Sequence, residues 1–189
     1  ALEGYFSGII EFSTNELVAN LIGGLHVSRP ERLEILMELG LPVIVAPGAL
    51  SLIVLSKEEA LEAKYEGRQK YFHNPRITLV RASRDEMKLI GRSLAEKMNK
   101  ARGRVKFLYP TEGFSSQDKA GLSLYDPEGN SLFLEELKRH LRKDIPVLEI
   151  SAHIHDDKFA AAAFEELMEV MGVGTLDRAR PQYTYSKLD

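Results

Sequence analysis

The chain has 189 residues, with 44% hydrophobic and 28% charged side chains, which is typical of one globular domain with a core of its own. Its formal net charge is −3, from 25 basic and 28 acidic residues without a long basic run, which argues against binding to nucleic acid. The absence of cysteine excludes disulfides, thiolate zinc sites and cysteine nucleophiles.

No segment of the sequence suits a membrane span or a secretion signal. The longest apolar stretch, residues 39–55, is shorter than the ~20 residues that a membrane-spanning helix needs, and it contains Pro42 and Pro47. The first four residues form neither a basic nor an apolar region of a signal peptide. We therefore expect a cytoplasmic protein that does not bind membranes.

Short apolar runs alternate with amphipathic stretches along the chain, which is typical of βαβ units around a parallel sheet. The predicted strands are residues 8–12, 42–46, 51–55, 77–80, 105–109 and 147–150. Capping boxes at 13–16 and 83–86 each predict a helix, and residues 30–39 a shorter one. Apolar side chains at helical spacing predict two more helices, one after a turn at 126–130 and one that ends at Gly172.

These elements predict a three-layer Rossmann-like α/β domain with a mostly parallel sheet over residues 1–172. Residues 173–189 lose the periodic pattern and are interpreted as a C-terminal tail. The residues before the first strand resemble the end of a helix capped by Gly4. A strand normally precedes such a helix, so we expect the first strand of the domain to be missing.

The polar loop at residues 110–118 directly follows a predicted central strand. Ligands of open α/β sheets bind outside the carboxyl ends of the strands. Glycine, hydroxyl side chains and the nearby Lys119 suit a phosphate or carboxylate held by backbone N–H groups. The alternative is a long connection capped by its own Ser and Asp side chains. The loop matches neither the Walker motif nor the dinucleotide fingerprint, so the class of ligand stays open.

Other loops after strands offer further candidate contacts. Pro47, Gly48 and Ala49 form a tight turn that either exposes backbone amides to a ligand or simply joins two strands. Thr14 follows the first predicted strand and is a candidate for the same cleft. Glu11 is interpreted as a solvated carboxylate at the end of that strand.

Two segments that contain histidines each have two possible interpretations. His153 and His155 point the same way along an extended segment, and Asp156 either completes a metal site or caps the next helix. Because a lone His-x-His pair is a weak signal, we assign no metal site. His73, in a turn with Asn74, is either a general base or phosphate contact, or a group that stabilises the turn.

Five segments in this order resemble the C-terminal half of the uncharacterised protein family that includes the tomato mosaic virus resistance protein. They are residues 8–17, 47–50, 73–75, 110–118 and 125–128. The likeness covers about residues 2–172. It implies a full-length protein with two Rossmann-like subdomains, of which this chain is the second and an N-terminal subdomain is its partner. Because members are described as carrying an ATP-binding domain, the resemblance also makes ATP and Mg²⁺ candidate ligands.

Three functions follow from these patterns, and whether the protein is an enzyme stays open because the resemblance implies no reaction. The first is a binding domain for a nucleotide or another phosphorylated or acidic small molecule. Its candidate contacts are Thr14, Pro47, Gly48, Ala49, Asn74, Thr111, Gly113, Phe114 and Ser116. The second is a hydrolase- or lyase-type catalytic domain. Its candidate groups are His73, Glu112, Ser115 and Asp118. The third is a non-catalytic assembly domain, and we expect a homo-oligomer.

Overall fold

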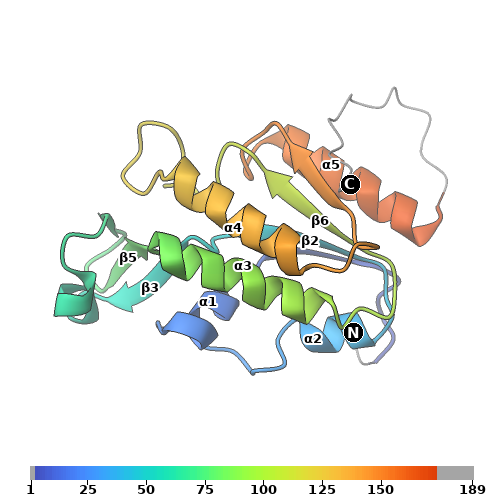
Figure 1. Ribbon diagram of the computed structural model, residues 1–189, viewed down its shortest axis with the longest axis horizontal. Coiled ribbons are helices and arrows are strands. Elements are labelled where there is room, and N and C mark those ends of the chain that lie inside the picture. Colours follow the sequence, from blue (N-terminus) through green and yellow to red (C-terminus); the bar gives the residue numbers. More distant parts are fainter. Residues whose placement is uncertain (1–2, 174–189) are drawn as a thin grey trace.

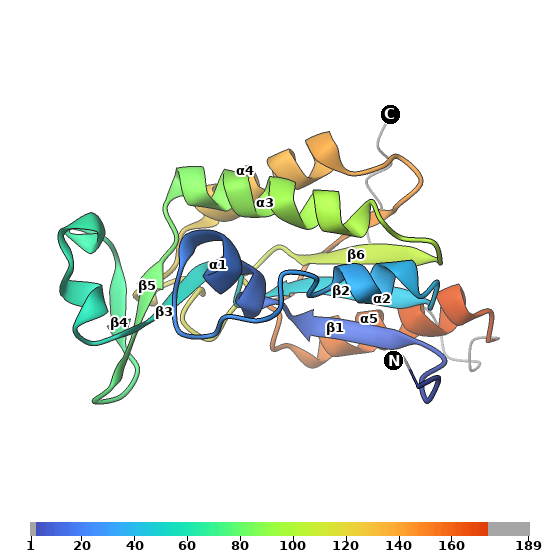
Figure 2. The same ribbon diagram turned by 90° about the horizontal axis from the view of Figure 1, so that it is seen from below.

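A four-stranded parallel sheet forms the centre of the domain in the computed structural model, which describes residues 3–173 (Figures 1 and 2). Its strands lie in the order β1-β2-β6-β7, and each pair of neighbours is parallel. They are β1 (Ile9–Ser13), β2 (Val43–Gly48), β6 (Val105–Pro110) and β7 (Val147–Ile150). The predicted parallel sheet is confirmed.

Helices cover both faces of this sheet, as Figure 2 shows. On one face lie α1 (Asn15–Ile22), α2 (Glu34–Glu38), α3 (Arg84–Met98) and α4 (Pro127–His140), and on the other lies α5 (Asp157–Met171). Side chains of a strand alternate between the two faces. Val43 and Val45 therefore belong to the core beneath the first group of helices, whereas Ile44 and Ala46 belong to the core beneath α5. The predicted three-layer Rossmann-like fold is confirmed.

A second, antiparallel sheet lies beside the carboxyl end of β2. It has the order β3-β5-β4, with β3 (Leu52–Ser56), β5 (Ile77–Arg81) and β4 (Lys70–Phe72). Two short 3₁₀ helices, η1 (Glu59–Leu61) and η2 (Ala63–Tyr65), join β3 to β4. All six predicted strands are present within two residues at each end. Strand β4 was not predicted, because three residues are too few to show an alternating pattern.

One of the two predicted capping boxes is present. At the start of α3, the Ser83 side chain accepts a hydrogen bond from the backbone N–H of Glu86, whose carboxylate accepts one from the backbone N–H of Ser83. At the start of α1 the prediction of a capping box is wrong, since no side chain caps this helix. The Thr14 hydroxyl donates instead to the carbonyl of Ala46 in β2. A hydrogen bond to a residue distant in sequence thus replaces the predicted local cap.

Of three other helices, α4 and α2 differ from the sequence predictions, and α5 agrees with its prediction. The predicted turn at 126–130 is wrong: α4 already begins at Pro127, and the Asp126 side chain caps it by accepting from Gly129 N–H at 3.0 Å. Proline suits the first position of a helix because its missing N–H would have no partner there. Helix α2 is shorter than predicted. Helix α5 is capped by Gly172, whose backbone has the left-handed conformation. The end of the helix at this glycine was predicted.

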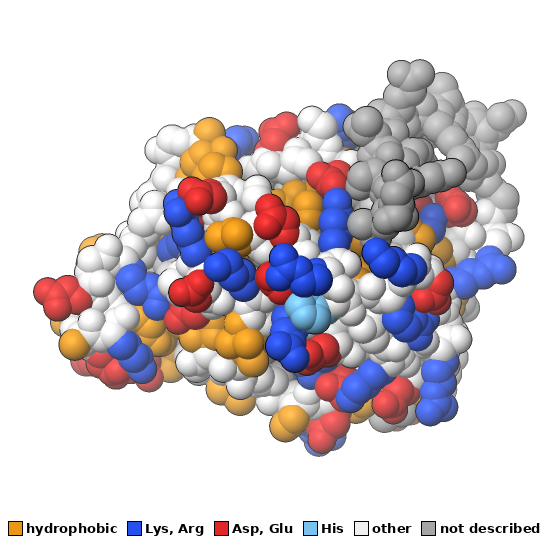
Figure 3. All heavy atoms as spheres, in the orientation of Figure 1, with side chains coloured by type: hydrophobic (Ala, Val, Ile, Leu, Met, Phe, Trp, Pro, Cys, Tyr) orange, Lys and Arg blue, Asp and Glu red, His pale blue; other side chains and the backbone are white. Residues whose placement is uncertain are grey.

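The surface carries mixed charges. On the face shown in Figure 3, basic and acidic side chains lie among one another over α3 and α4. No helix within residues 3–173 is long and apolar enough to span a membrane. Residues 174–189, to which most of the predicted tail belongs, lie outside the described residues.

Helices α3 and α4 pack closely at Gly91. A Cβ atom at this position would lie 2.4 Å from the carbonyl oxygen of Phe133 in α4, which is closer than van der Waals contact. Glycine costs about 1 kcal/mol relative to alanine inside a helix, so its presence in α3 reflects the close approach of the two backbones.

We predict that Gly91→Ala lowers the free energy of unfolding by about 1–2 kcal/mol, because the overpacking cost of ~1–3 kcal/mol exceeds the gain in helix propensity. Urea denaturation followed by circular dichroism measures the change. The matched control is Arg92→Ala, whose side chain is 59% exposed and which should stay within about 0.5 kcal/mol of the parent. A Gly91→Ala variant more stable than the parent would contradict the packing argument.

Candidate functional site

The loops after β1, β2 and β6 meet at the carboxyl edge of the parallel sheet. The backbone N–H of Thr14 donates to the carbonyl of Gly48 at 3.1 Å, and that of Ala49 donates to the carbonyl of Phe114 at 2.9 Å. The side-chain amide of Asn15 also donates to the carbonyl of Ala49 at 2.8 Å. These bonds bring Thr14, the turn at 47–49 and the loop at 110–118 together, as expected for one cluster.

Two glycines permit close backbone approach within this cluster. A Cβ at Gly48 would lie 2.1 Å from the carbonyl oxygen of Phe12, and one at Gly113 would lie 1.7 Å from that of Asp118. Gly113 also has a φ of +124°, a conformation that other residues rarely adopt. Both glycines are therefore needed for the backbone path of the cluster, and neither offers room for a side chain.

Phe114 belongs to the core and not to the exposed surface of the loop. It is 1% exposed. Its ring packs edge-on against Tyr109 and Phe133, with ring centroids 5.4 and 5.6 Å apart. Burial raises the pKa of Tyr109, followed in importance by the charges of Glu149 and Asp118. The predicted ligand contact at Phe114 is thus an apolar anchor for the loop.

Asp118 forms a buried ion pair with Arg81, the last residue of β5. Oδ2 of Asp118 lies 3.2 Å from Nη1 of Arg81 and also accepts from Nδ2 of Asn130 at 2.9 Å and from the N–H of Phe114 at 3.1 Å. The two side chains are 0% and 3% exposed. Asp118, predicted as a catalytic group, is therefore enclosed within the protein and holds the loop in place.

Sequence analysis missed Arg81. Its guanidinium also donates to the carbonyls of Leu124 and Asp126 and, at 2.6 Å, to Oδ1 of Asn130. A charged residue at the end of an apolar strand was the available signal, although it could not reveal the partners. Arg81 thereby fixes the middle and the end of the segment between β6 and α4.

Other residues of the loop are exposed. Thr111, Glu112 and Ser116 are accessible to solvent, as is Lys119 just beyond them. The N–H of Asp118 donates to the carbonyl of Ser115 at 3.0 Å, which closes a turn.

Not all donors of this turn are used within the protein. Among residues 3–173, no acceptor is recorded for the backbone N–H groups of Ser116 and Gln117. The hydroxyl of Ser115 is buried without a hydrogen-bond partner in the same part of the chain. Buried polar groups are normally paired, so this turn carries unused hydrogen-bonding capacity.

The loop after β7 joins the same cluster through His153, which is 3% exposed. Its Nε2 lies 3.0 Å from the carbonyl oxygen of Ser115, and its Nδ1 accepts from the N–H of His155 at 3.2 Å. Because Nδ1 accepts from an N–H, Nε2 is the ring nitrogen that donates to the carbonyl of Ser115. Since both ring nitrogens are used within the protein, neither offers a lone pair to a metal. The Asp156 side chain accepts from the N–H of His153 at 2.8 Å and does not cap α5.

His155 is exposed and lies near Lys119. Its pKa is lowered mainly by desolvation, further by repulsion from His153 and Lys119, and it is raised in part by Asp156. His153 bonds to the carbonyl of Ser115, and the N–H of Ile154 donates to that of Gly113 at 3.2 Å, so the loops after β6 and β7, which carry Lys119 and His155, lie against each other. Lys119 therefore supplies the positive charge beside the turn at 115–118, because the lowered pKa leaves His155 mostly neutral near pH 7.

His73 and Asn74 lie elsewhere, in the turn between β4 and β5. Both are exposed. Oδ1 of Asn74 accepts from the N–H groups of Arg76 and Ile77, each at 2.9 Å, which makes this a side-chain-stabilised turn. Arg81 is at the opposite end of β5, and the strand between Ile77 and Arg81 is about 13 Å long, at roughly 3.3 Å per residue. The structure does not bring His73 and Asn74 to the loop at 110–118.

The chain is similar to proteins of one uncharacterised family. A sequence model described as the C-terminal domain of the uncharacterised protein family UPF0261 matches residues 1–171. A UPF0261 protein of Clostridium tetani is 31% identical over 169 residues, which are 89% of this chain and 42% of the relative. One of Mesorhizobium japonicum is 32% identical over 161 residues, 84% of this chain and 41% of the relative.

A plant protein is also similar. The ToMV resistance protein Tm-1(GCR237) of Solanum lycopersicum is 28% identical over 169 residues, which are 88% of this chain and 22% of that protein. The chain thus spans less than half of the length of each of these three relatives.

We predict that Asp118→Ala lowers the free energy of unfolding by about 3–5 kcal/mol, because it leaves Arg81 buried without a counter-charge. Thermal and urea denaturation measure the loss. Ser116→Ala, an exposed change in the same loop, is the control and should stay within about 0.5 kcal/mol of the parent. Equal stability of the two variants would show that the ion pair does not hold the loop.

Proposed function

This chain belongs to the UPF0261 family, and on this premise we propose that its domain binds a small anionic molecule at the carboxyl edge of the parallel sheet. The occupant is a nucleotide such as ATP or another phosphorylated or acidic metabolite. The resemblance found in the sequence supports ATP as the first ligand to test.

The observation that carries the proposal is the gathering of donors and positive charge at one exposed place. The unused N–H groups of Ser116 and Gln117 lie in the turn just before Lys119, and the loop that carries His155 contacts this turn through the bond of His153 to the carbonyl of Ser115. Backbone N–H groups together with a cation are the usual means by which proteins hold phosphate and carboxylate groups. Thr111 and Ser116 add hydroxyl donors on the same loop.

The surrounding groups also fit Mg²⁺ brought by a nucleotide. Mg²⁺ prefers oxygen ligands and is commonly held by one or two carboxylates together with phosphates of the substrate. Glu112 supplies an exposed carboxylate on the same loop as the proposed phosphate contacts.

Catalysis has weaker support than binding. A hydroxyl nucleophile needs a base within hydrogen-bond reach, and among the described residues the Ser115 hydroxyl has no such partner. His153 bonds to the carbonyl of Ser115 and not to its hydroxyl, and His73 lies at the far end of β5. A homo-oligomer or an assembly role stays a prediction, for which light scattering of the purified chain is the test.

We predict that calorimetric titration with ATP and Mg²⁺ gives saturable binding and that Lys119→Gln weakens it about tenfold, as expected for one charged contact. The matched control is Lys57→Gln, an exposed lysine just after β3, which should bind like the parent. Sulfate and inorganic phosphate distinguish a general anion site from a nucleotide site. Absence of binding by all three ligands, or equal affinity of the two variants, would contradict the proposal.

We further predict that sulfate binds more tightly as the pH falls from about 7.5 to 6. His155 has a lowered pKa in the free protein, and a bound anion favours its protonated form. Binding of sulfate is therefore coupled to the uptake of protons. The affinity of the protein for sulfate rises as the pH decreases toward and through the imidazole range near ~6.5. Sulfate is suitable because it does not titrate there. His155→Ala should abolish the pH dependence, and an unchanged slope in this variant would exclude the role of His155.

A further inference from the structure

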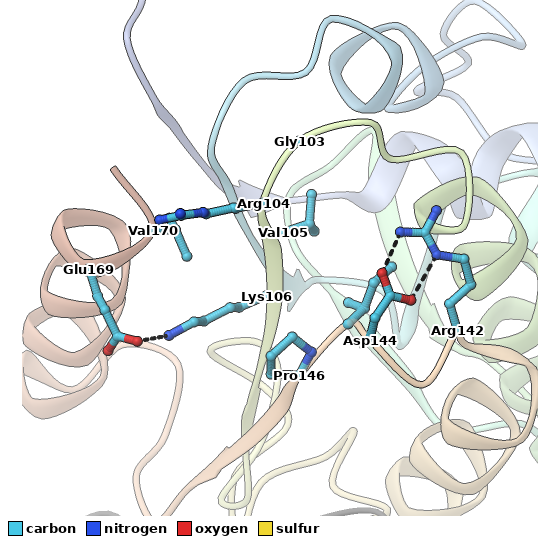
Figure 4. Close-up of a pocket in the computed structure, with 10 residues that line it drawn as sticks. Gly103, Arg104, Val105, Lys106, Arg142, Asp144, Pro146, Glu169 and Val170 are labelled. Atoms are coloured by element: carbon cyan, nitrogen blue, oxygen red, sulfur yellow. Dashed lines mark hydrogen bonds and ion pairs between the residues drawn. The ribbon is translucent and has the colours of Figure 1, made fainter. Parts of the chain in front are cut away.

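A pocket of about 370 Å³ lies at the amino edge of the parallel sheet, opposite the proposed anion site. The starts of β6 and β7, the loops before them and the last turn of α5 line it (Figure 4). No candidate site residue from the sequence is among its lining residues. Its volume lies in the range of roughly 300–1,000 Å³ that is usual for small-molecule sites.

Two of the three basic side chains in this pocket are neutralised within the protein. Nζ of Lys106 contacts the carboxylates of Glu166 and, at 2.9 Å, Glu169. Arg142 forms a two-pronged pair with Asp144, with Nε–Oδ1 and Nη2–Oδ2 distances of 3.0 and 2.8 Å. These pairs fix the two opposite walls of the pocket, as Figure 4 shows.

Arg104 is the third basic residue; it is exposed, and its guanidinium forms no hydrogen bond or ion pair within residues 3–173. Figure 4 shows its side chain extending toward the last turn of α5, beside Val170. The negative end of a helix attracts a cation, which accounts for this direction. A guanidinium presents five N–H donors in a planar arrangement that matches a carboxylate. In Arg104 these donors have no acceptor within residues 3–173.

The remaining lining favours a ligand with an apolar body. Val105, Ile145, Pro146 and Val170 supply apolar surface in the same pocket. The carboxylates of Asp144 and Glu169 are also part of the lining, and they disfavour a doubly charged anion.

From this combination we infer that the pocket binds a small monocarboxylic acid. Its carboxylate pairs with Arg104, and its apolar part lies against the start of β6 and the end of α5. This site is separate from the one at the carboxyl edge, because parallel strands begin at one edge of the sheet and end at the other.

Nuclear magnetic resonance titration of the full chain with benzoate tests the inference. We expect benzoate to shift the backbone amide signals of Val105, Lys106 and Val170 in a saturable way. Benzamide, of the same shape without the charge, and phenyl phosphate at pH 8, with two charges, should bind at least several times more weakly.

Variants assign the contact to Arg104. Arg104→Gln should weaken benzoate binding about tenfold or more, since it removes a charged hydrogen-bond pair. Arg102→Gln removes the same charge from an exposed neighbour outside the pocket and should bind benzoate like the parent. The unperturbed remainder of the spectrum shows that each variant is folded.

Several outcomes would overturn the inference. They are equal binding of benzoate and benzamide, tighter binding of phenyl phosphate, no loss of affinity in Arg104→Gln, or shifts confined to residues outside the pocket. Shifts confined to the loop at 110–118 would assign benzoate to the carboxyl edge instead. The inference for the amino edge would then be wrong while the proposed anion site would gain support.

Discussion

The ion pair between Arg81 and Asp118 joins the parts of the domain on which the proposed site depends. Arg81 ends a strand of the small antiparallel sheet, and Asp118 belongs to the loop after β6 of the parallel sheet. Asn130 of α4 bonds to both side chains. Burying two charges is costly unless each is paired and hydrogen-bonded. Here Oδ2 of Asp118 meets Arg81, Asn130 and the N–H of Phe114, whereas Oδ1 has no hydrogen-bond partner within residues 3–173. The loop can therefore take its observed shape only when both sheets and α4 are in place.

This pair divides the loop into a buried and an exposed part. Gly113, Phe114 and Asp118 face the interior, where close backbone contact, aromatic packing and the ion pair hold them. Thr111, just before these anchors, and Ser116, between them, are exposed. Groups that are fixed before a ligand arrives lose little conformational entropy on binding. The same arrangement explains why Phe114 and Asp118, both predicted as site residues, are buried while Thr111 and Ser116 stay accessible to the anion that we propose.

The sequence predicted those features of the fold that depend on neighbouring residues. Apolar runs revealed the parallel strands, and the local geometry of Ser83 and Glu86 revealed the start of α3. The same signal failed at the start of α1 because the Thr14 hydroxyl bonds to Ala46 of another strand. At the site, the loop and the turn at 47–49 were identified by their places after strands. Arg81 was missed because its partners come from distant segments that only folding brings together.

The parallel sheet also accounts for the two different ways of holding an anion that we propose. At its carboxyl edge the chain leaves each strand through a loop, so backbone N–H groups such as those of Ser116 and Gln117 become available beside a cation. At its amino edge the backbone enters the strands, and Val43 N–H, for example, already donates to the carbonyl of Arg104. Recognition there must come from side chains, and the open guanidinium of Arg104 is the group that can provide it. The direction of the strands thus determines which groups each edge of the sheet can offer to an anion, although the formal net charge of the chain is slightly negative.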